Sequence, residues 1–266
     1  MMRNYLPTGI LLLWCLMALV GPLLPLDPNR IDLPHILAGP GVEYLLGNDD
    51  LGRSILDRLV MGARTSFVVA FGVVLVSGLV GILVGAFAAY VGGLVDLLLM
   101  RIIDVFLAFP GILLAIALAG VMGPGIDNVV IALSVVGWVG YARLARAQIL
   151  SLKHRDHVDA AIALGAGHVR IITRHLLPLI AAPLIIEATF GIAGIVIAEA
   201  GLSFLGLGVQ PPEASWGSMI RDGARYMLVA PHMVLAPGLA ILLVVMAVNL
   251  LGDRLRDRLD VRSVNY

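Results

Sequence analysis

The chain has 266 residues, of which 60% are hydrophobic and only 14% are charged, and its 18 basic side chains balance 18 acidic ones. A soluble domain carries about a quarter charged residues, so this composition excludes a soluble globular protein, and the zero net charge gives no sign of a nucleic-acid partner. The single cysteine, Cys15, excludes an intrachain disulfide and a paired-cysteine metal or redox site.

Six apolar runs approach the length of about 20 residues that a transmembrane helix needs. They cover residues 4–26, 65–95, 105–126, 128–142, 178–201 and 226–252. The fourth run is short, and Trp138, Tyr141 and Arg143 would anchor it at the membrane surface. We therefore predict an all-α polytopic membrane protein, in which residues 1–266 form one domain with six transmembrane helices.

The first run has some features of a cleaved signal peptide, because Arg3 precedes its apolar core and Gly21 lies near its end. A secretory signal ends in a small-residue cleavage site. Residues 23–26 continue the apolar run instead. We therefore expect a retained transmembrane helix.

Basic residues orient the predicted spans, because cytoplasmic loops carry an excess of Lys and Arg. Residues 143–177 hold six basic side chains and residues 253–266 hold four, whereas residues 27–64 hold six acids against four bases. We therefore predict that both termini and the loop 143–177 are cytoplasmic. The loop 27–64 and the segment 202–231 are then extracytoplasmic.

Two glutamates interrupt the fifth apolar run. Glu187 and Glu199 are twelve residues apart, which separates them by about 120° around a helix axis, so they do not share a face. Because intramembrane acids usually face a cavity or a partner, both are candidates for lining a transport pathway. Two alternatives stay open: a carboxyl group bonded to a neighbouring helix with no transport role, and a fifth span that is split or re-entrant.

A nucleotide-binding loop is absent from the sequence. Such a loop needs Gly-Lys-Ser or Gly-Lys-Thr, so that the lysine reaches the terminal phosphates. The only lysine, Lys153, follows Leu152. The chain is therefore not expected to hydrolyse ATP, and a transporter driven by ATP would need another subunit for that step.

The loop 143–177 contains a short predicted helix. Asp156 and Asp159 lie one turn apart at its start, where acids complement the positive end of the helix dipole. Val158, Ala161 and Ile162 would form a small apolar face, and Gly165 can end the helix. Either this face docks against a partner protein or the loop is a solvated hairpin with no partner.

The sequence from Asp159-Ala160-Ala161 through Gly165 to Leu177-Pro178 resembles the cytoplasmic coupling loop of ABC-importer permeases. That family has Glu-Ala-Ala, three residues, Gly, nine residues and Ile-x-Leu-Pro. The spacing agrees throughout, although Asp159 replaces Glu and His175 replaces Ile. Further blocks resemble the dipeptide, oligopeptide and nickel permeases of this family. They lie at residues 46–54, 62–66, 100–104, 108–110, 202–208, 211–212 and 216–217.

The resemblance implies a type I ABC-importer permease fold in a bacterial inner membrane, most like the second permease chain of a dipeptide system. It implies three kinds of partner besides membrane lipid: a second homologous permease chain, two ATP-binding subunits and an extracytoplasmic substrate-binding protein. It also implies that the coupling loop contacts the ATP-binding subunits. The expected coupling residues are Asp156, Asp159, Ala160, Ala161, Leu164 and Gly165.

Other functions remain as alternatives. A nickel or metal-chelate permease shares nearly every sequence block, and an ion-driven transporter would use Glu187 and Glu199 as proton carriers. A membrane hydrolase lacks a nucleophile and base at useful spacing, since Ser203 is not in a Gly-x-Ser-x-Gly turn. We expect no cofactor and no metal site, because His154 and His157 supply only two ligands.

Overall fold

The computed structural model describes residues 5–259 as a bundle of helices. The only strand-type pairing within these residues is an isolated antiparallel bridge between Asn48 and Ser54, so the all-helical prediction is confirmed. The helices are α1 (Leu6–Val20), α2 (Ile55–Val91), α3 (Gly93–Leu107), α4 (Gly111–Met122), α5 (Ile126–Leu152), α6 (Asp156–Ala163), α7 (His168–Arg170), α8 (Leu177–Phe204), α9 (Trp216–Ala224) and α10 (His232–Leu259). Both predicted cytoplasmic termini, residues 1–4 and 260–266, lie outside the described residues.

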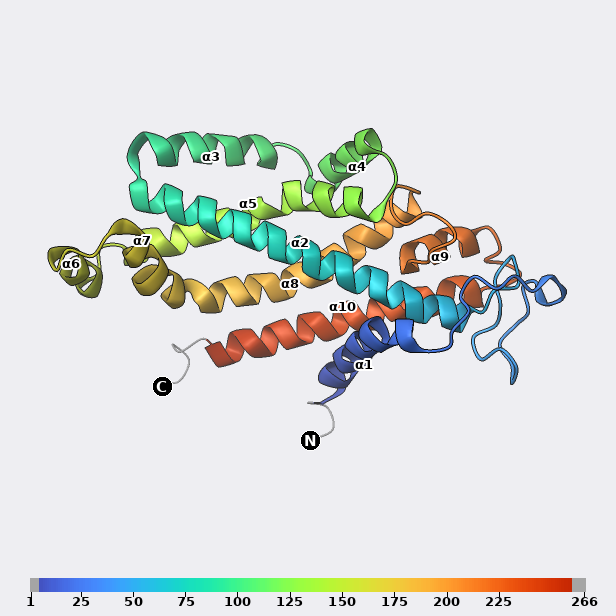
Figure 1. Ribbon diagram of the computed structural model, residues 1–266. Helices are drawn as coiled ribbons and strands as arrows, with labels where there is room; N and C mark the ends of the chain where they lie inside the picture. The colour runs from blue at the N-terminus through green and yellow to red at the C-terminus, as the bar shows by residue number, and fades with distance from the viewer. Residues whose placement is uncertain (1–4, 260–266) are drawn as a thin grey trace.

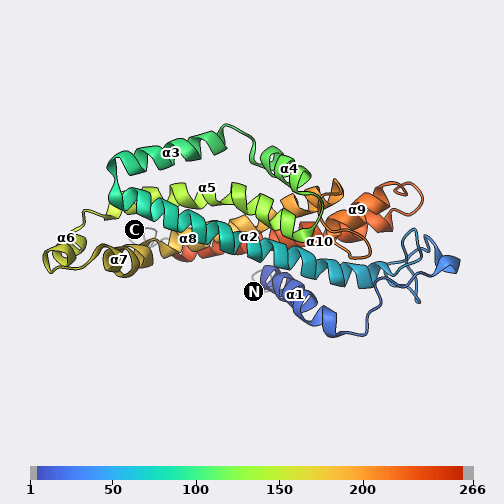
Figure 2. The same cartoon turned by 45° about the horizontal axis from the view of Figure 1, so that its top comes forward.

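The long helices run side by side between two distinct ends (Figure 1). One end carries α6 and α7, and we call it the α6 end. The other carries the segment 24–54 and α9, and we call it the α9 end. Figures 1 and 2 both show α3 and α4 on one side of α2 and α5, with α1 on the opposite side, where α1 packs against α2 and α10.

Five helical segments are long and apolar enough to cross a bilayer. They are Leu6–Leu23, Ile55–Val91, Ile126–Leu152, His168–Phe204 and His232–Leu259. The fifth predicted span lies within one continuous helical segment, His168–Phe204. The alternative of a split fifth span is therefore wrong. A sixth crossing exists if α3 and α4 together form one span, and these two helices meet at an angle of 84°.

This bend overturns the prediction of a continuous third helix over residues 105–126. Pro110 precedes α4 and has no amide hydrogen to donate. A proline also disfavours helical geometry in the residue before it, here Phe109. The helix therefore ends at Leu107 and restarts at Gly111 in a new direction.

Two predicted loops are shorter than expected because helices continue into them. Ser54 caps α2 by accepting a hydrogen bond from the Asp57 amide at 3.3 Å, so α2 occupies the last part of the predicted loop 27–64. Its 37 residues extend for about 55 Å, which exceeds the hydrocarbon core of about 30 Å. Likewise, α5 runs on to Leu152, so residues 143–152 of the predicted loop 143–177 are helical.

Small residues bring α2 and α5 into close contact along their length. A methyl group at Gly85 would overlap the carbonyl oxygen of Ala142 and lie 2.9 Å from the Ala142 Cα. At Gly81 it would overlap the carbonyl oxygen of Trp138. Small side chains permit such approach in membranes, where helix association relies on van der Waals packing rather than on exclusion of water. The glycines of α2 therefore set the spacing at the centre of the bundle.

We predict that Gly85→Ala lowers the stability of the chain by about 1–3 kcal/mol, the usual cost of overpacking, because the added methyl group meets backbone atoms that cannot rotate away. Gly120→Ala is the matched control, since its methyl group would have no neighbour within 4 Å. The thermal unfolding midpoints of the detergent-solubilised variants measure the difference. A midpoint for Gly85→Ala equal to that of the control would contradict the close α2–α5 contact.

Candidate functional site

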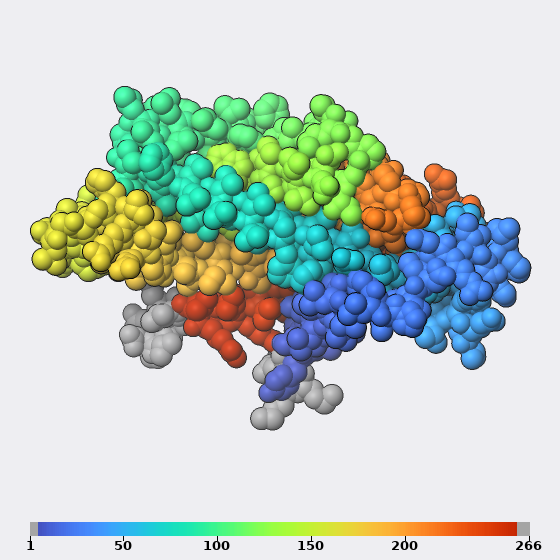
Figure 3. Space-filling model, in the orientation of Figure 1, coloured from blue at the N-terminus to red at the C-terminus, as the bar shows by residue number. Residues whose placement is uncertain are grey.

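The α6 segment forms the tip of the molecule at the α6 end. Space-filling Figure 3 shows this part of the chain, coloured yellow, projecting beyond the bundle. Asp156 and Asp159 lie in the first turn of α6, as predicted. The helix ends where the amide of Gly165 donates to the Ile162 carbonyl at 2.9 Å and the amide of Ala166 donates to the Ala161 carbonyl at 3.0 Å.

This pair of bonds requires a left-handed residue at the turn. Gly165 supplies it with a φ of +81°, a conformation that costs a residue with a Cβ roughly 1–2 kcal/mol. The predicted role of Gly165 in ending the helix is therefore confirmed. The turn aims the residues that follow back toward the bundle.

The two faces of α6 have different surroundings. Val158 and Ala161 are buried, and Val158 belongs to a cluster with Ile171 and Leu176, which also includes residues of α2 and α5. Val158 and Ala161 therefore do not lie on the outward surface with Ile162, contrary to the prediction that these three residues form one apolar face for a partner. The sequence pattern could not decide this, because the helix is apolar on more than one side.

The outward surface of the tip combines acids with uncovered apolar groups. Asp156, Asp159, Ala160 and Gly165 are exposed. Leu164 is 88% exposed and Val169 is 75% exposed, and Ile162 is half exposed. Large aliphatic side chains this open at a polar end of a membrane protein suggest a protein contact. We call these exposed residues the α6 surface: Asp156, Asp159, Ala160, Ile162, Leu164, Gly165 and Val169.

Direct bonds tie the tip to the far end of α2. The Tyr90 hydroxyl and His168 Nδ1 are 2.8 Å apart, and Lys153 Nζ donates to the Ala89 carbonyl at 3.1 Å. The Arg146 guanidinium forms two hydrogen bonds with the Asp96 carboxylate, at 2.5 and 2.6 Å, which join α5 to α3. The tip is therefore attached to α2 through His168, as well as along the chain to α8.

The connection from the tip into α8 is a π-helix over Ile171–Leu176. Ile171 and Leu176 anchor it in the cluster that contains Val158. His175, which stands where the related motif has Ile, lies within this segment and is only partly buried. Short π-helical segments occur frequently at functional sites, and this one joins the tip to a membrane span.

The two glutamates of α8 lie in opposite environments. Glu187 is exposed, and its carboxylate lies beside Gly140 of α5, where an added Cβ would be 3.4 Å from Glu187 Oε1. Glu199 is 1% exposed and accepts hydrogen bonds from Ser66 of α2 at 3.0 Å and from Ser203 at 2.8 Å. Glu199 thus joins neighbouring helices, whereas Glu187 faces out of the chain.

The serine partners of Glu199 were not predicted from the sequence. Ser203 had a local signal, since it follows Glu199 by four residues and shares its helix face. Ser66 is 133 residues away, and no local pattern indicates that pairing. Among residues 5–259 no three potential ligands from His, Cys, Asp and Glu gather in one place, so His154 and His157 acquire no third partner there.

We predict that Glu199→Ala destabilises the chain by about 1–3 kcal/mol, because the buried hydroxyls of Ser66 and Ser203 lose their acceptor. Glu199→Gln keeps an acceptor oxygen of the same size, so its loss is expected to be smaller. Thermal unfolding midpoints of the two variants in detergent provide the test. Midpoints that are equal to each other and to that of the natural chain would contradict the bonding role of Glu199.

Comparison with known proteins agrees with this arrangement. Residues 81–264 match the family described as "Binding-protein-dependent transport system inner membrane component". The nickel transport system permease protein NikC of Escherichia coli (strain K12) is 42% identical over 241 residues, covering 91% of this chain and 87% of that protein. The di/tripeptide transport system permease protein DppC of Pseudomonas aeruginosa (strain UCBPP-PA14) is 41% identical over 263 residues, covering 96% and 86%.

The fold has a counterpart among solved structures. A chain of the MetNI methionine ABC transporter in an inward-facing conformation superposes with a TM-score of 0.61 and 21% sequence identity, covering 75% of this chain and 95% of that chain. The predicted type I permease fold is confirmed. From the family match and the identities to NikC and DppC, this chain belongs to the family of binding-protein-dependent inner membrane transport components.

Proposed function

We propose that this family member is a transmembrane permease subunit of an ATP-driven importer, which passes short peptides from an extracytoplasmic binding protein into the cytoplasm. Permeases of its family work with ATP-binding and substrate-binding components. The observation that carries the proposal is the α6 surface, an exposed and partly apolar tip on a chain whose sequence has no nucleotide-binding loop. The ATP would then be hydrolysed by two partner subunits at this tip.

The same reasoning orients the chain in the bacterial inner membrane. The α6 end carries the basic side chains of the 143–177 segment and the last turn of α10, which contains Arg256 and Arg258. An excess of basic residues favours the cytoplasmic side. With the α6 end cytoplasmic, both termini are cytoplasmic too, and the segment 24–54 and α9 face the binding protein.

The proposed coupling mechanism follows from how the tip is attached. When the ATP-binding subunits close around α6, the exposed side chains Ile162 and Leu164 would be seated in a cleft between them. The buried side of α6, at Val158, would carry the displacement to the cluster with Ile171 and Leu176. The bond between Tyr90 and His168 would carry it to α2. The spans would then rock and open the pathway to the other side.

The pathway itself would lie between this chain and a second, homologous permease chain. Glu187 is the candidate pathway residue, because it is exposed in the middle of a membrane-spanning helix. A carboxylate at that depth faces a partner or an aqueous cavity rather than lipid. Glu199 is a weaker candidate for lining a pathway, since its two hydrogen bonds remain inside the chain.

Peptides are the cargo that the relatives favour. Relatives at 41–43% identity are named as transporters of dipeptides, of di- and tripeptides, of peptides and of glutathione. Nickel is the second candidate, because NikC is 42% identical over most of this chain. An ion-driven transporter using Glu187 and Glu199 is disfavoured, because only one of these glutamates is exposed.

We expect the complex that co-purifies with this chain to contain a second permease and ATP-binding subunits, and to take up a labelled dipeptide in proteoliposomes. Uptake should require ATP and the binding protein, and should not require a proton gradient. Labelled Ni²⁺ is the comparison cargo. Uptake of Ni²⁺ without uptake of the dipeptide would transfer the proposal to the nickel alternative, and uptake by the chain alone without ATP would reject both.

We also predict that Asp159→Arg and Gly165→Glu abolish uptake in this assay while leaving membrane insertion intact. Asp159→Arg should keep the thermal midpoint of the natural chain, whereas Gly165→Glu should lower it, because a Cβ at a φ of +81° costs roughly 1–2 kcal/mol. The reason is that both add bulk or a reversed charge to a surface that must fit closely against a partner. Gly167→Ala is the control, because Gly167 lies two residues further on with an ordinary φ of −71° and open space around it. Normal uptake by the first two variants would disprove the coupling role of the α6 surface.

A further inference from the structure

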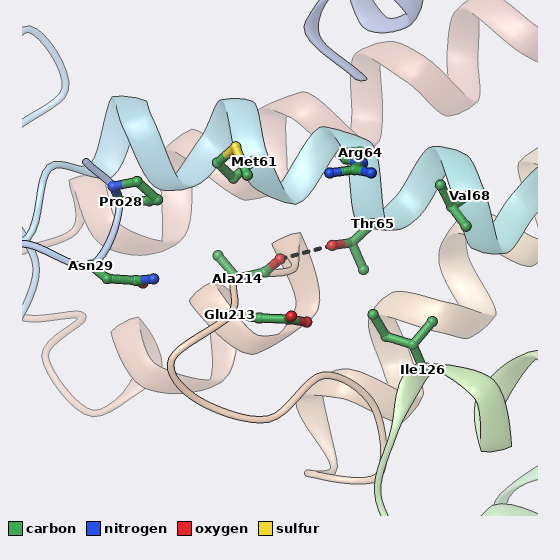
Figure 4. Close-up of a pocket in the computed structure, with 9 residues that line it drawn as sticks. All are labelled: Pro28, Asn29, Met61, Arg64, Thr65, Val68, Ile126, Glu213 and Ala214. Atoms are coloured by element: carbon green, nitrogen blue, oxygen red, sulfur yellow. Dashed lines mark hydrogen bonds between the residues drawn. The ribbon is translucent and has the colours of Figure 1, made fainter. Parts of the chain in front are cut away.

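A pocket of about 350 Å³ opens at the α9 end (Figure 4), and the α6 surface lies at the opposite end of the bundle (Figure 1). Its walls come from segments that are distant in the sequence: the loop at Asn29, the beginning of α2, the first residue of α5, and the loop that holds Glu213 before α9. The volume lies near the lower end of the range of about 300–1,000 Å³ that small-molecule sites occupy. No function described above uses this pocket.

The pocket carries one positive and one negative side chain. Arg64 on α2 and Glu213 on the facing loop both line it, and both are exposed. No ion pair joins either of them to another residue within the part of the chain that the structure describes. Two opposite charges that share a pocket without neutralising each other favour a ligand with one group of each sign.

Hydrogen bonds to the backbone hold the two loops that line the pocket. The Thr65 hydroxyl donates to the carbonyl of Ala214 at 3.0 Å, which holds the loop of Glu213 against α2 (Figure 4). On the other side, Arg58 Nη1 donates to the carbonyl of Pro28 at 3.4 Å. The backbone of both loops is therefore positioned before any ligand arrives, which reduces the entropy lost on binding.

We propose that this pocket binds the zwitterionic backbone of a short peptide, with the peptide carboxylate on Arg64 and the peptide ammonium on Glu213. A fully extended dipeptide spans about 7 Å, which suits two charges too far apart to pair directly. Arg64 can meet a carboxylate with two parallel N–H groups. Met61, Val68 and Ile126 supply apolar contact for peptide side chains of any sequence.

This inference rests on the proposed function, because it assigns the peptide cargo a receiving site on the side that faces the binding protein. Recognition through the two termini explains how a permease could accept peptides of varied sequence. It also discriminates against free metal ions, which carry no negative group for Arg64.

The test pairs changes in the protein with changes in the peptide. Binding of labelled glycyl-leucine to the purified whole complex, without binding protein, is measured by equilibrium dialysis and compared with N-acetyl-glycyl-leucine and glycyl-leucine amide. We expect the natural complex to prefer glycyl-leucine over each analogue roughly three- to fivefold, the size of one exposed ion pair. Arg64→Gln should remove only the preference over the amide, and Glu213→Gln only the preference over the acetylated peptide.

Arg225→Gln is the matched control, since Arg225 is an exposed charge at the same end that does not line the pocket. It should keep both preferences. Equal binding of all three peptides by the natural complex, or variants that weaken all three alike, would overturn the proposal. So would variants that change only the stimulation of ATP hydrolysis by the binding protein, because the pocket would then be a protein contact.

The outcome is separable from that of the proposed function. ATP-dependent dipeptide uptake by the same preparation, together with unaltered preferences in both pocket variants, would reject the pocket and keep the importer. Failure of the natural complex to take up any peptide would reject the peptide importer itself.

Discussion

The close approach of α2 to α5 is the constraint on which the rest of the molecule depends. Glycines at positions 81 and 85 bring the backbones so near that the Ala142 backbone fills the space a side chain would need. In a bilayer this contact cannot draw on water exclusion, so close packing holds it, together with the hydrogen bond that the Ser77 hydroxyl of α2 donates to the Ser134 carbonyl of α5 at 3.4 Å. Because α2 and α5 define the centre, α8 can pack against both of them and α10 against α8, and Ser66 of α2 can donate its hydrogen bond to Glu199 of α8.

At the α6 end, the side of α6 that packs on the bundle is distinct from the side that is left open to a partner. Val158 and Ala161 keep the short helix attached to the bundle, while Leu164 and Ile162 are left uncovered. The bond from Tyr90 to His168 adds a second attachment that does not pass through α8. A partner bound to the outward side would therefore pull on α2 as well as on α8, as the proposed rocking of the spans requires.

The features of the fold and of the candidate site that depend on neighbouring residues could be predicted from the sequence. The apolar runs, the acids at the start of α6 and the turn at Gly165 each depend on a few neighbouring residues. The bend at Pro110 also had a local signal, but the unbroken hydropathy of residues 105–126 outweighed it. The start of α2 was hidden because its first turns carry charges and lie where a loop was expected. The partner of Glu199 and the inward face of Ala161 depend on contacts across the fold, and a single sequence holds no record of those.

The length of α2 has a consequence for how the two ends communicate. This one uninterrupted helix carries Tyr90, bonded to the tip, and Thr65, bonded to the wall of the α9-end pocket. The 25 residues between them correspond to about 37 Å of helix. If α2 moves as one rigid helix, a displacement at Tyr90 also displaces Thr65 and the pocket wall. The alternative is that α2 bends. In the proposed orientation, a displacement of the tip would therefore reach the pocket on the other side of the membrane through one helix, without a relay of side chains.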